Sequence, residues 1–247
     1  MRVFYIPLPT RRLRRRLLAA VLALTLTGLL VLSLKGIQEL TPIPATGQSG
    51  DPVFQVDIKE PLVALTINVA WGEDFLPGLL AAFEDYGVKA TFFIVGDWAE
   101  QFPDLTRNIA TEGHELGNHS WSHPYPTQIP AEELKKEIVR TEKLLVELAG
   151  KRPALFAPPY GEWDKQVVQT AAEAGYRTIM WSVDTIDWQQ PGVGIIAERV
   201  LNNIQPGGIV LMHPTEQTAQ ALPLILDGLK KKGLKAVTVS ELLNAAS

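Results

Sequence analysis

The 247-residue sequence contains no cysteine and only four histidines. The absence of cysteine excludes a disulfide framework, a cysteine nucleophile, a zinc finger and an iron–sulfur cluster. It does not define the redox compartment, because a chain without thiols is insensitive to it. The length suits one domain or two small ones.

Basic side chains are scarce beyond residue 35. Residues 1–35 hold seven of the 23 basic residues and no acidic one, so 16 basic residues face 27 acidic ones in the remaining chain, a net charge of −11. Nucleic-acid backbones are bound by clustered positive charge. We therefore expect no nucleic-acid partner for this acidic body.

One long run lacks charge altogether. Residues 17–34 are rich in Leu, Ala and Val and follow an arginine cluster. The run is long enough to cross a thin bilayer as a helix, and the positive-inside rule keeps residues 1–16 in the cytoplasm. A cleaved signal peptide, which would make the protein secreted, is the alternative, but residues 33–36 make a poor cleavage site. We expect a single-pass anchor in the cell membrane, with the following domain extracellular.

The chain after the anchor alternates between strand-like and helix-like patterns. Residues 35–52 are interrupted by prolines and glycines and indicate a linker. Within residues 53–247, strands are expected at 63–67, 91–95, 154–156, 178–181, 209–212 and 235–239. Helices are expected at 76–86, 104–111, 131–148, 165–174, 195–202 and 219–232. This alternation predicts an α/β domain with a mostly parallel sheet. Because a full eight-fold barrel typically takes ~250 residues, we expect a distorted (β/α) barrel with fewer than eight regular units.

His119 and His123 form an H-x-x-x-H pattern in a segment rich in Ser, Trp and Pro. The segment follows Gly117 and indicates a loop at the end of a strand. Imidazole is a common ligand of zinc and similar ions, so the pair is a candidate metal site. Two polar loop histidines without a metal explain the spacing equally well.

A second set of polar residues follows two expected strands. Asp184 and Asp187 come after the strand at 178–181, and His213 directly follows the strand at 209–212. The active sites of (β/α) barrels lie at the carboxyl ends of the strands. A carboxylate beside an imidazole can orient it and favour the protonated form that a general acid needs. Solvated loop side chains are the alternative.

Five segments, taken in order, resemble the polysaccharide deacetylase family, also called the chitooligosaccharide deacetylase homology domain. They are K-A-T-F-F-I-V-G at 89–96, G-H-E-L-G-N-H-S-W-S-H-P at 113–124, F-A-P-P-Y-G at 156–161, W-S-V-D-T-I-D-W at 181–188 and L-M-H at 211–213. The resemblance covers residues 61–243. It implies a distorted (β/α) barrel that removes acetyl groups from chitin, peptidoglycan or xylan with the help of a divalent metal, zinc being expected.

The resemblance also implies residue roles. His119 and His123 match the metal-binding histidines, His213 matches the general acid, and Asp187 matches the aspartate that holds it. Tyr160 matches the residue whose backbone N–H contributes to the oxyanion hole. The metal would polarise the acetyl carbonyl and activate water, and the metal and the backbone donor would stabilise the tetrahedral oxyanion.

Three aromatic residues, Trp71, Trp188 and Tyr160, are candidates for stacking on the sugar. Packing in the pocket wall is the alternative for each of them. The pair Trp71-Gly72 is similar to a first-motif variant found in the branch of the family associated with spore-forming bacteria.

The first and third motifs depart from the family pattern. T-F-D-D is replaced by Thr66-Ile67-Asn68-Val69, and the arginine of the third motif is replaced by Ala157. Asn68 stands at the position of the general base, whose loss typically costs ~10²–10⁴-fold in rate. Val69 stands at the position of the third metal ligand, and catalytic zinc usually has three protein ligands. Losing the base and its arginine together avoids leaving an uncompensated charge in the pocket.

Glu73 and Asp74 follow the first motif and could supply a replacement carboxylate. They are also explained as solvated charges, with Asp74 capping the next helix. One functional hypothesis is therefore a membrane-anchored, metal-assisted deacetylase of a peptidoglycan or chitin-like wall glycan with impaired chemistry. The alternative is an inactive family member that binds this cell-wall polysaccharide. A purely structural surface protein is the third possibility.

Overall fold

The computed structural model describes residues 50–246. They belong to the second of two units into which the chain divides, Met1–Pro44 and Ala45–Ser247. The expected cytoplasmic segment 1–16, the anchor 17–34 and most of the linker 35–52 lie outside the described residues. None of the helices within residues 50–246 has the length and apolar character needed to span a bilayer.

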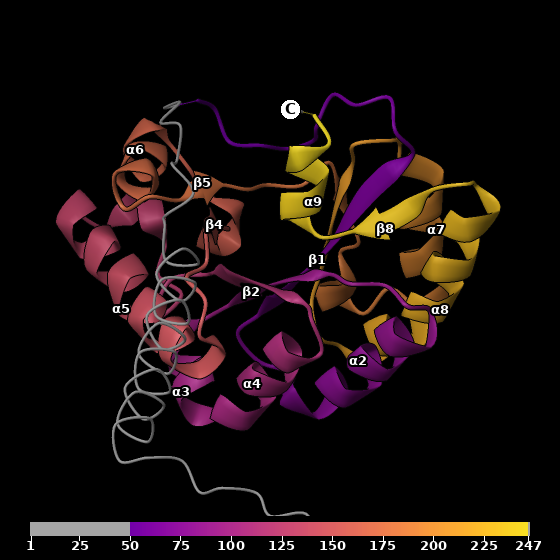
Figure 1. Ribbon diagram of the computed structural model, residues 1–247, viewed down its shortest axis with the longest axis horizontal. Helices are drawn as coiled ribbons and strands as arrows, with labels where there is room; N and C mark the ends of the chain where they lie inside the picture. Colours follow the sequence, from indigo (N-terminus) through magenta and orange to yellow (C-terminus); the bar gives the residue numbers. More distant parts are fainter. Residues whose placement is uncertain (1–49, 247) are drawn as a thin grey trace, which may run out of the picture. The chain divides into compact units, whose positions relative to one another are not determined.

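A parallel sheet forms the centre of the domain (Figure 1). Its strands within residues 50–246 are β1 (Leu62–Val69), β2 (Thr91–Ile94), β3 (Glu115–Asn118), β4 (Leu155–Phe156), β5 (Arg177–Thr178), β6 (Val183–Asp184), β7 (Ile209–Met212) and β8 (Lys235–Val237). The strand order is β5-β4-β3-β2-β1-β7-β6, with β8 beside the start of β1. All neighbouring strands pair in parallel. The arrangement confirms the expected α/β class and the distorted barrel.

The chain before β1 bridges the irregular side of the barrel. The N–H of Val53 donates to the carbonyl of Thr178 beside β5, and the N–H of Met180 donates back to the carbonyl of Val53. Three residues later, the N–H of Val56 donates to the carbonyl of Gly207, just before β7. Residues 53–56 therefore fill the place of a regular barrel unit.

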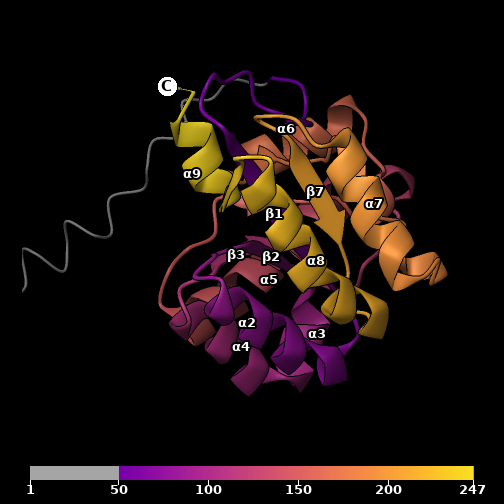
Figure 2. The ribbon, with the colours of Figure 1, turned by 90° about the vertical axis from the view of Figure 1, so that its right-hand side faces the viewer.

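Helices surround the sheet on its outer side (Figures 1 and 2). They are α2 (Leu76–Asp85), α3 (Gly96–Gln101), α4 (Pro103–Thr111), α5 (Ala131–Ala149), α6 (Lys165–Glu173), α7 (Val193–Asn203), α8 (Glu216–Lys231) and α9 (Val239–Asn244). The last helix, α9, closes the amino-terminal end of the barrel, since Val239 and Leu242 belong to the interior cluster. Glu115 on β3 holds this helix by accepting hydrogen bonds from the N–H and the hydroxyl of Ser240.

Side chains alternate between two cores along β1. Val63, Leu65, Ile67 and Val69 pack in the cluster between the sheet and the helices. Ala64 instead packs inside the barrel with Phe93, Leu155, Ala157, Ile179 and Ile209. Because successive side chains of a strand point to opposite faces, Asn68 lies on the interior side and Val69 on the helix side.

Several expected boundaries are wrong. The strand expected at 178–181 ends at Thr178, because Met180 bonds to Val53 instead of continuing the sheet. The strand expected at 235–239 ends at Val237, because Thr238 and Glu241 form the capping box that begins α9. Asp74 does not cap α2: it lies in the 3-10 turn η1 (Glu73–Phe75), and no side-chain cap bond is present there.

One buried histidine lies in the core between the sheet and the helices. His114 packs against the rings of Phe83 and Phe92, with centroids 5.4 and 5.1 Å away, and its Nδ1 accepts from the N–H of Ala90. Its Nε2 is buried without a hydrogen-bond partner. Burial, helped by the charge of Lys89, lowers the pKa of His114 to about 4.

This depressed pKa predicts a loss of stability in acid. Because unfolded histidine titrates near pH ~6.5, the stabilising effect of the neutral form is complete above that pH. As the pH falls toward about 4 this stabilisation is lost, and the free energy of unfolding decreases by up to about 3 kcal/mol. His114→Asn keeps an acceptor for Ala90 and cannot titrate, so the free energy of unfolding in urea should fall less between neutral and acidic pH than it does for wild type. Equal losses in the two proteins would contradict this account.

Candidate functional site

The candidate residues meet at the carboxyl end of the sheet. Asn68 is the penultimate residue of β1, His119 follows β3, Ala157 follows β4 and His213 follows β7. The N–H of Ala157 donates to the carbonyl of Asn118, which extends the pairing of β3 with β4. Side chains far apart in the sequence are thus brought to one end of the barrel, where (β/α) barrels carry their active sites.

The structure brings Asp187 and His213 into direct contact. Asp187 is fully buried in the 3-10 turn η4 (Asp187–Gln189). Its Oδ1 accepts from Nδ1 of His213 at 2.8 Å, and its Oδ2 accepts from the N–H of His213 at 2.6 Å. The hydroxyl of Thr218 donates to the same Oδ2 at 2.7 Å. The carboxylate therefore fixes the imidazole and leaves Nε2 as the ring nitrogen available to a ligand.

His119 and His123 also lie together. Their ring centroids are 4.9 Å apart. Nδ1 of His119 donates to the carbonyl of Ala157 at 2.6 Å. Burial and the nearby His123 lower the pKa of His119 to about 3, outweighing the bond to Ala157, and burial also lowers the pKa of His123. Both rings are therefore neutral at physiological pH, and Nε2 of His119 is left as an acceptor.

The residues present do not fit a three-ligand metal site. Residues 50–246 contain no group of three or more His, Cys, Asp or Glu side chains that could hold a metal ion. Val69 is fully buried in the cluster facing the helices, and neither Glu73 nor Asp74 forms such a group with the histidines. What remains is a histidine pair, one ligand short of the usual catalytic zinc site.

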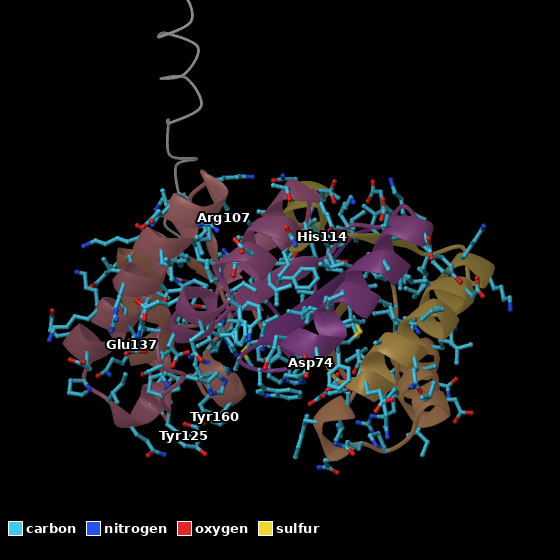
Figure 3. All side chains as sticks on the ribbon, turned by 90° about the horizontal axis from the view of Figure 1, so that it is seen from below. Asp74, Arg107, His114, Tyr125, Glu137 and Tyr160 are labelled. Carbon is cyan, nitrogen blue, oxygen red and sulfur yellow. The ribbon has the colours of Figure 1, made fainter. Side chains whose placement is uncertain are left out.

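Exposed aromatic rings lie on the loops of this end. Tyr160, after β4, stacks on Tyr125 with centroids 4.0 Å apart, and Figure 3 shows the two side by side. Tyr160 also contacts the ring of His123 at 4.4 Å. Trp71 after β1 and Trp188 after β6 are 44% and 55% exposed. Tyr125 was not predicted as a site residue from the sequence. The one feature that could have indicated it is its position two residues after His123.

Strained backbone is concentrated on the same loops. Within the described part of the chain, the non-glycine residues with positive φ are Ser120, His123, Tyr160, Ile186 and Gln190. Each such conformation costs of order 1–3 kcal/mol and persists only where its surroundings enforce it. The loops are therefore held in specific conformations by their contacts.

Glu137 on α5 holds the loop that carries the histidine pair. Its Oε2 accepts from the N–H of Trp121 at 2.9 Å and from the N–H of Ser122 at 2.7 Å. The guanidinium of Arg140, one turn further along α5, lies 3.5 Å from the centre of the Trp121 ring. No sequence signal singles out Glu137 among the carboxylates of α5, because only the tertiary fold places it beside this loop (Figure 3).

Glu137→Ala should destabilise the protein, because two N–H groups lose their acceptor. The expected loss is about 1–3 kcal/mol in the free energy of unfolding. Glu133→Ala is the matched control, since Glu133 on the same helix makes only an exposed pair with Lys136, and such pairs contribute little. Equal effects of the two variants would contradict the positioning role of Glu137.

The histidine pair should account for whatever zinc binding the protein shows. His119→Ala and His123→Ala should each weaken zinc binding at least about tenfold, because loss of a ligand costs more than loss of an outer-shell partner. Titration calorimetry measures the affinity. Unchanged binding in both variants would exclude the pair as the ligands.

Comparison with known proteins agrees with this geometry. The family model described as Polysaccharide deacetylase matches residues 55–179. The chain is 39% identical to the uncharacterized protein YlxY of Bacillus subtilis, over 78% of this chain and 61% of that protein, less than two thirds of its length. It is 38% identical to a peptidoglycan-N-acetylglucosamine deacetylase of Bacillus cereus, over 79% of this chain and 94% of the deacetylase.

Solved structures include a relative with the same fold. A CE4 family pseudoenzyme from Bacillus anthracis is 36% identical and superposes with a TM-score of 0.77, covering 84% of this chain and 71% of the pseudoenzyme. A mutant of that protein, described as having restored enzymatic activity, superposes with the same TM-score at 34% identity, over 84% of this chain and 74% of the mutant. The family match, the extensive identity and the shared fold together establish that the chain belongs to the polysaccharide deacetylase family, with peptidoglycan deacetylases among its relatives.

Proposed function

We propose that this protein is a catalytically silent relative of the peptidoglycan deacetylases that binds the cell-wall glycan. The observation that carries the proposal is the loss of two matched positions, Asn68 and Ala157, on the interior side of the carboxyl end, together with an apolar Val69 that faces the helices instead of the site. Asn68 and Val69 end β1 where the resemblance places the base and the third metal ligand, and Ala157 replaces the arginine after β4. An amide, an isopropyl group and a methyl group cannot take over these roles.

The burial of these positions supports a neutral pocket. Asn68 is 7% exposed on the interior side of β1, and Ala157 packs in the apolar interior cluster with Leu155 and Phe93. A charged base and its arginine would be stable there only as a pair. Their joint replacement gives a pocket with neither the carboxylate base that the resemblance implies nor a complete metal site, so a divalent metal such as zinc is at most weakly held by the histidine pair.

The binding features persist beside this loss. The Asp187–His213 contact can hold a hydrogen-bonding imidazole toward a glycan, and exposed tyrosines and tryptophans offer faces on which sugar rings stack. The name of the Bacillus cereus deacetylase relative supports peptidoglycan as the glycan, and an acetylated chitin-like oligosaccharide is its simplest substitute.

We place the domain outside the cell, anchored by residues 17–34. The support is the uncharged run after an arginine cluster, which suits a single-pass membrane helix. The wall polysaccharide lies on that side of the membrane. Cleavage of the run would release the same domain as a secreted protein.

Slow deacetylation is the second candidate. It is favoured by the Asp187–His213 contact, which has the geometry of an oriented general acid. It requires a base that the described residues lack at the end of β1. We therefore expect turnover to be lower than in an intact relative by roughly 10²–10⁴-fold or more.

Restoring the lost residues should restore chemistry. The triple variant Asn68→Asp, Val69→Asp, Ala157→Arg should release acetate from acetylated glycan in the presence of zinc, by more than the product of the single effects, because residues of one catalytic unit are not additive. Val69→Asp alone should destabilise the protein, because Val69 faces the apolar cluster under the helices. Support for this expectation comes from the mutant of the Bacillus anthracis pseudoenzyme with restored activity.

The matched control is His213→Ala in the triple background. It should abolish the regained acetate release, because it removes the general acid while keeping all three restored residues. A folded, zinc-loaded triple variant that releases no more acetate than wild type would contradict the expectation that the rest of the catalytic site is preserved.

A further inference from the structure

A pocket lies beside His213 and does not include the replaced positions Asn68, Val69 and Ala157. It is lined by Trp71, Phe75, Trp188, Gln190, Glu216 and Gln217, among others, and its volume is about 150 Å³. Ordinary small-molecule sites occupy ~300–1,000 Å³. The pocket is therefore sized for one end of a larger ligand, such as an edge of a single sugar in a glycan chain.

The pocket walls come from three segments that are fastened to one another. Gly72 has φ 85°, and a Cβ there would lie 2.1 Å from the carbonyl oxygen of Pro214, so the Trp71–Phe75 loop is seated directly on the turn before α8. The N–H of Gly192 donates to the side-chain oxygen of Gln217 at 2.8 Å, which ties the loop after η4 to α8. Such preformed walls reduce the ordering cost of binding.

The rings and the charge of the pocket define its ligand. Trp71, Phe75 and Trp188 supply aromatic faces, on which both the apolar faces of sugars and cations bind. Glu216 supplies an exposed carboxylate, and no Lys or Arg side chain lines the pocket. Glu73 and Asp74, between Trp71 and Phe75, add further negative charge. An anionic ligand is repelled here, and a neutral acetamido group has no positive charge to pair with the carboxylate, whereas a protonated amine has one.

We propose that this pocket binds a sugar carrying a protonated amine, as in a deacetylated 2-amino sugar of the glycan. The inference rests on the proposed function, because it names which sugar of the bound glycan the protein prefers. Trp71 connects the pocket to the degenerate site, since its ring lies parallel to that of His213 with centroids 6.0 Å apart. One glycan chain can thus contact both His213 and the amine pocket.

The test compares two tetrasaccharides, one of glucosamine and one of N-acetylglucosamine, by titration calorimetry on the full-length protein in mild detergent. The wild type should bind the glucosamine oligomer about tenfold more tightly. Glu216→Gln should remove this preference, because it should weaken binding of the glucosamine oligomer about tenfold more than binding of the acetylated oligomer. Glu112→Gln removes the same charge at the exposed end of α4, at the opposite end of the barrel, and should keep the preference.

Three kinds of result would overturn the amine pocket. Equal affinities of the wild type for the two oligomers, or an undiminished preference in Glu216→Gln, would overturn the amine pocket while leaving glycan binding intact. If Glu216→Gln binds neither oligomer and its circular dichroism spectrum is unchanged, Glu216 has a packing role, and this result would also overturn the amine pocket. Failure of the wild type to bind either oligomer would overturn the inference and the proposed function together.

Discussion

The alternation of side chains along parallel barrel strands governs the whole site. On β1 it sends Val63, Leu65, Ile67 and Val69 to the helices and leaves Asn68 with the interior. On β4 and β7 the same period of two places Ala157 and His213 on the interior side at the carboxyl end. Residues from distant parts of the sequence therefore converge, and the convergence survives even where their chemistry has been replaced.

Charge explains which replacements occur together. Asp187 is fully buried, and it keeps three hydrogen bonds, two from His213 and one from Thr218. Such a carboxylate is stable without a metal or an arginine, because its partners satisfy both oxygens. The base position and Ala157 lack comparable partners of their own. The aspartate and arginine that the family resemblance implies at these positions would need each other as partners, and the neutral residues Asn68 and Ala157 leave no charge unpaired.

The loops at the carboxyl end of the barrel are held in specific conformations by their contacts. Glu137 fastens the His119–His123 loop to α5, and Gly72 seats the Trp71 loop against Pro214. The left-handed residue Ser120 occurs on the loop that Glu137 holds, and Tyr160 and Ile186 are left-handed residues on the neighbouring loops. Because backbone strain of this kind is costly, these conformations persist only where the surrounding contacts enforce them.

The sequence by itself determined the α/β class, the distorted barrel, the family and the candidate residues, because these depend on local periodicity and on motifs contiguous in the chain. It also determined that Asn68, Val69 and Ala157 lack the chemistry of the family. Only the tertiary structure decided that residues 53–56 bridge the barrel, that Glu137 holds the histidine loop and that Glu216 shares a pocket with Trp71 and Trp188. Those contacts join side chains far apart in the chain, and no local pattern encodes a partner that folding alone brings near.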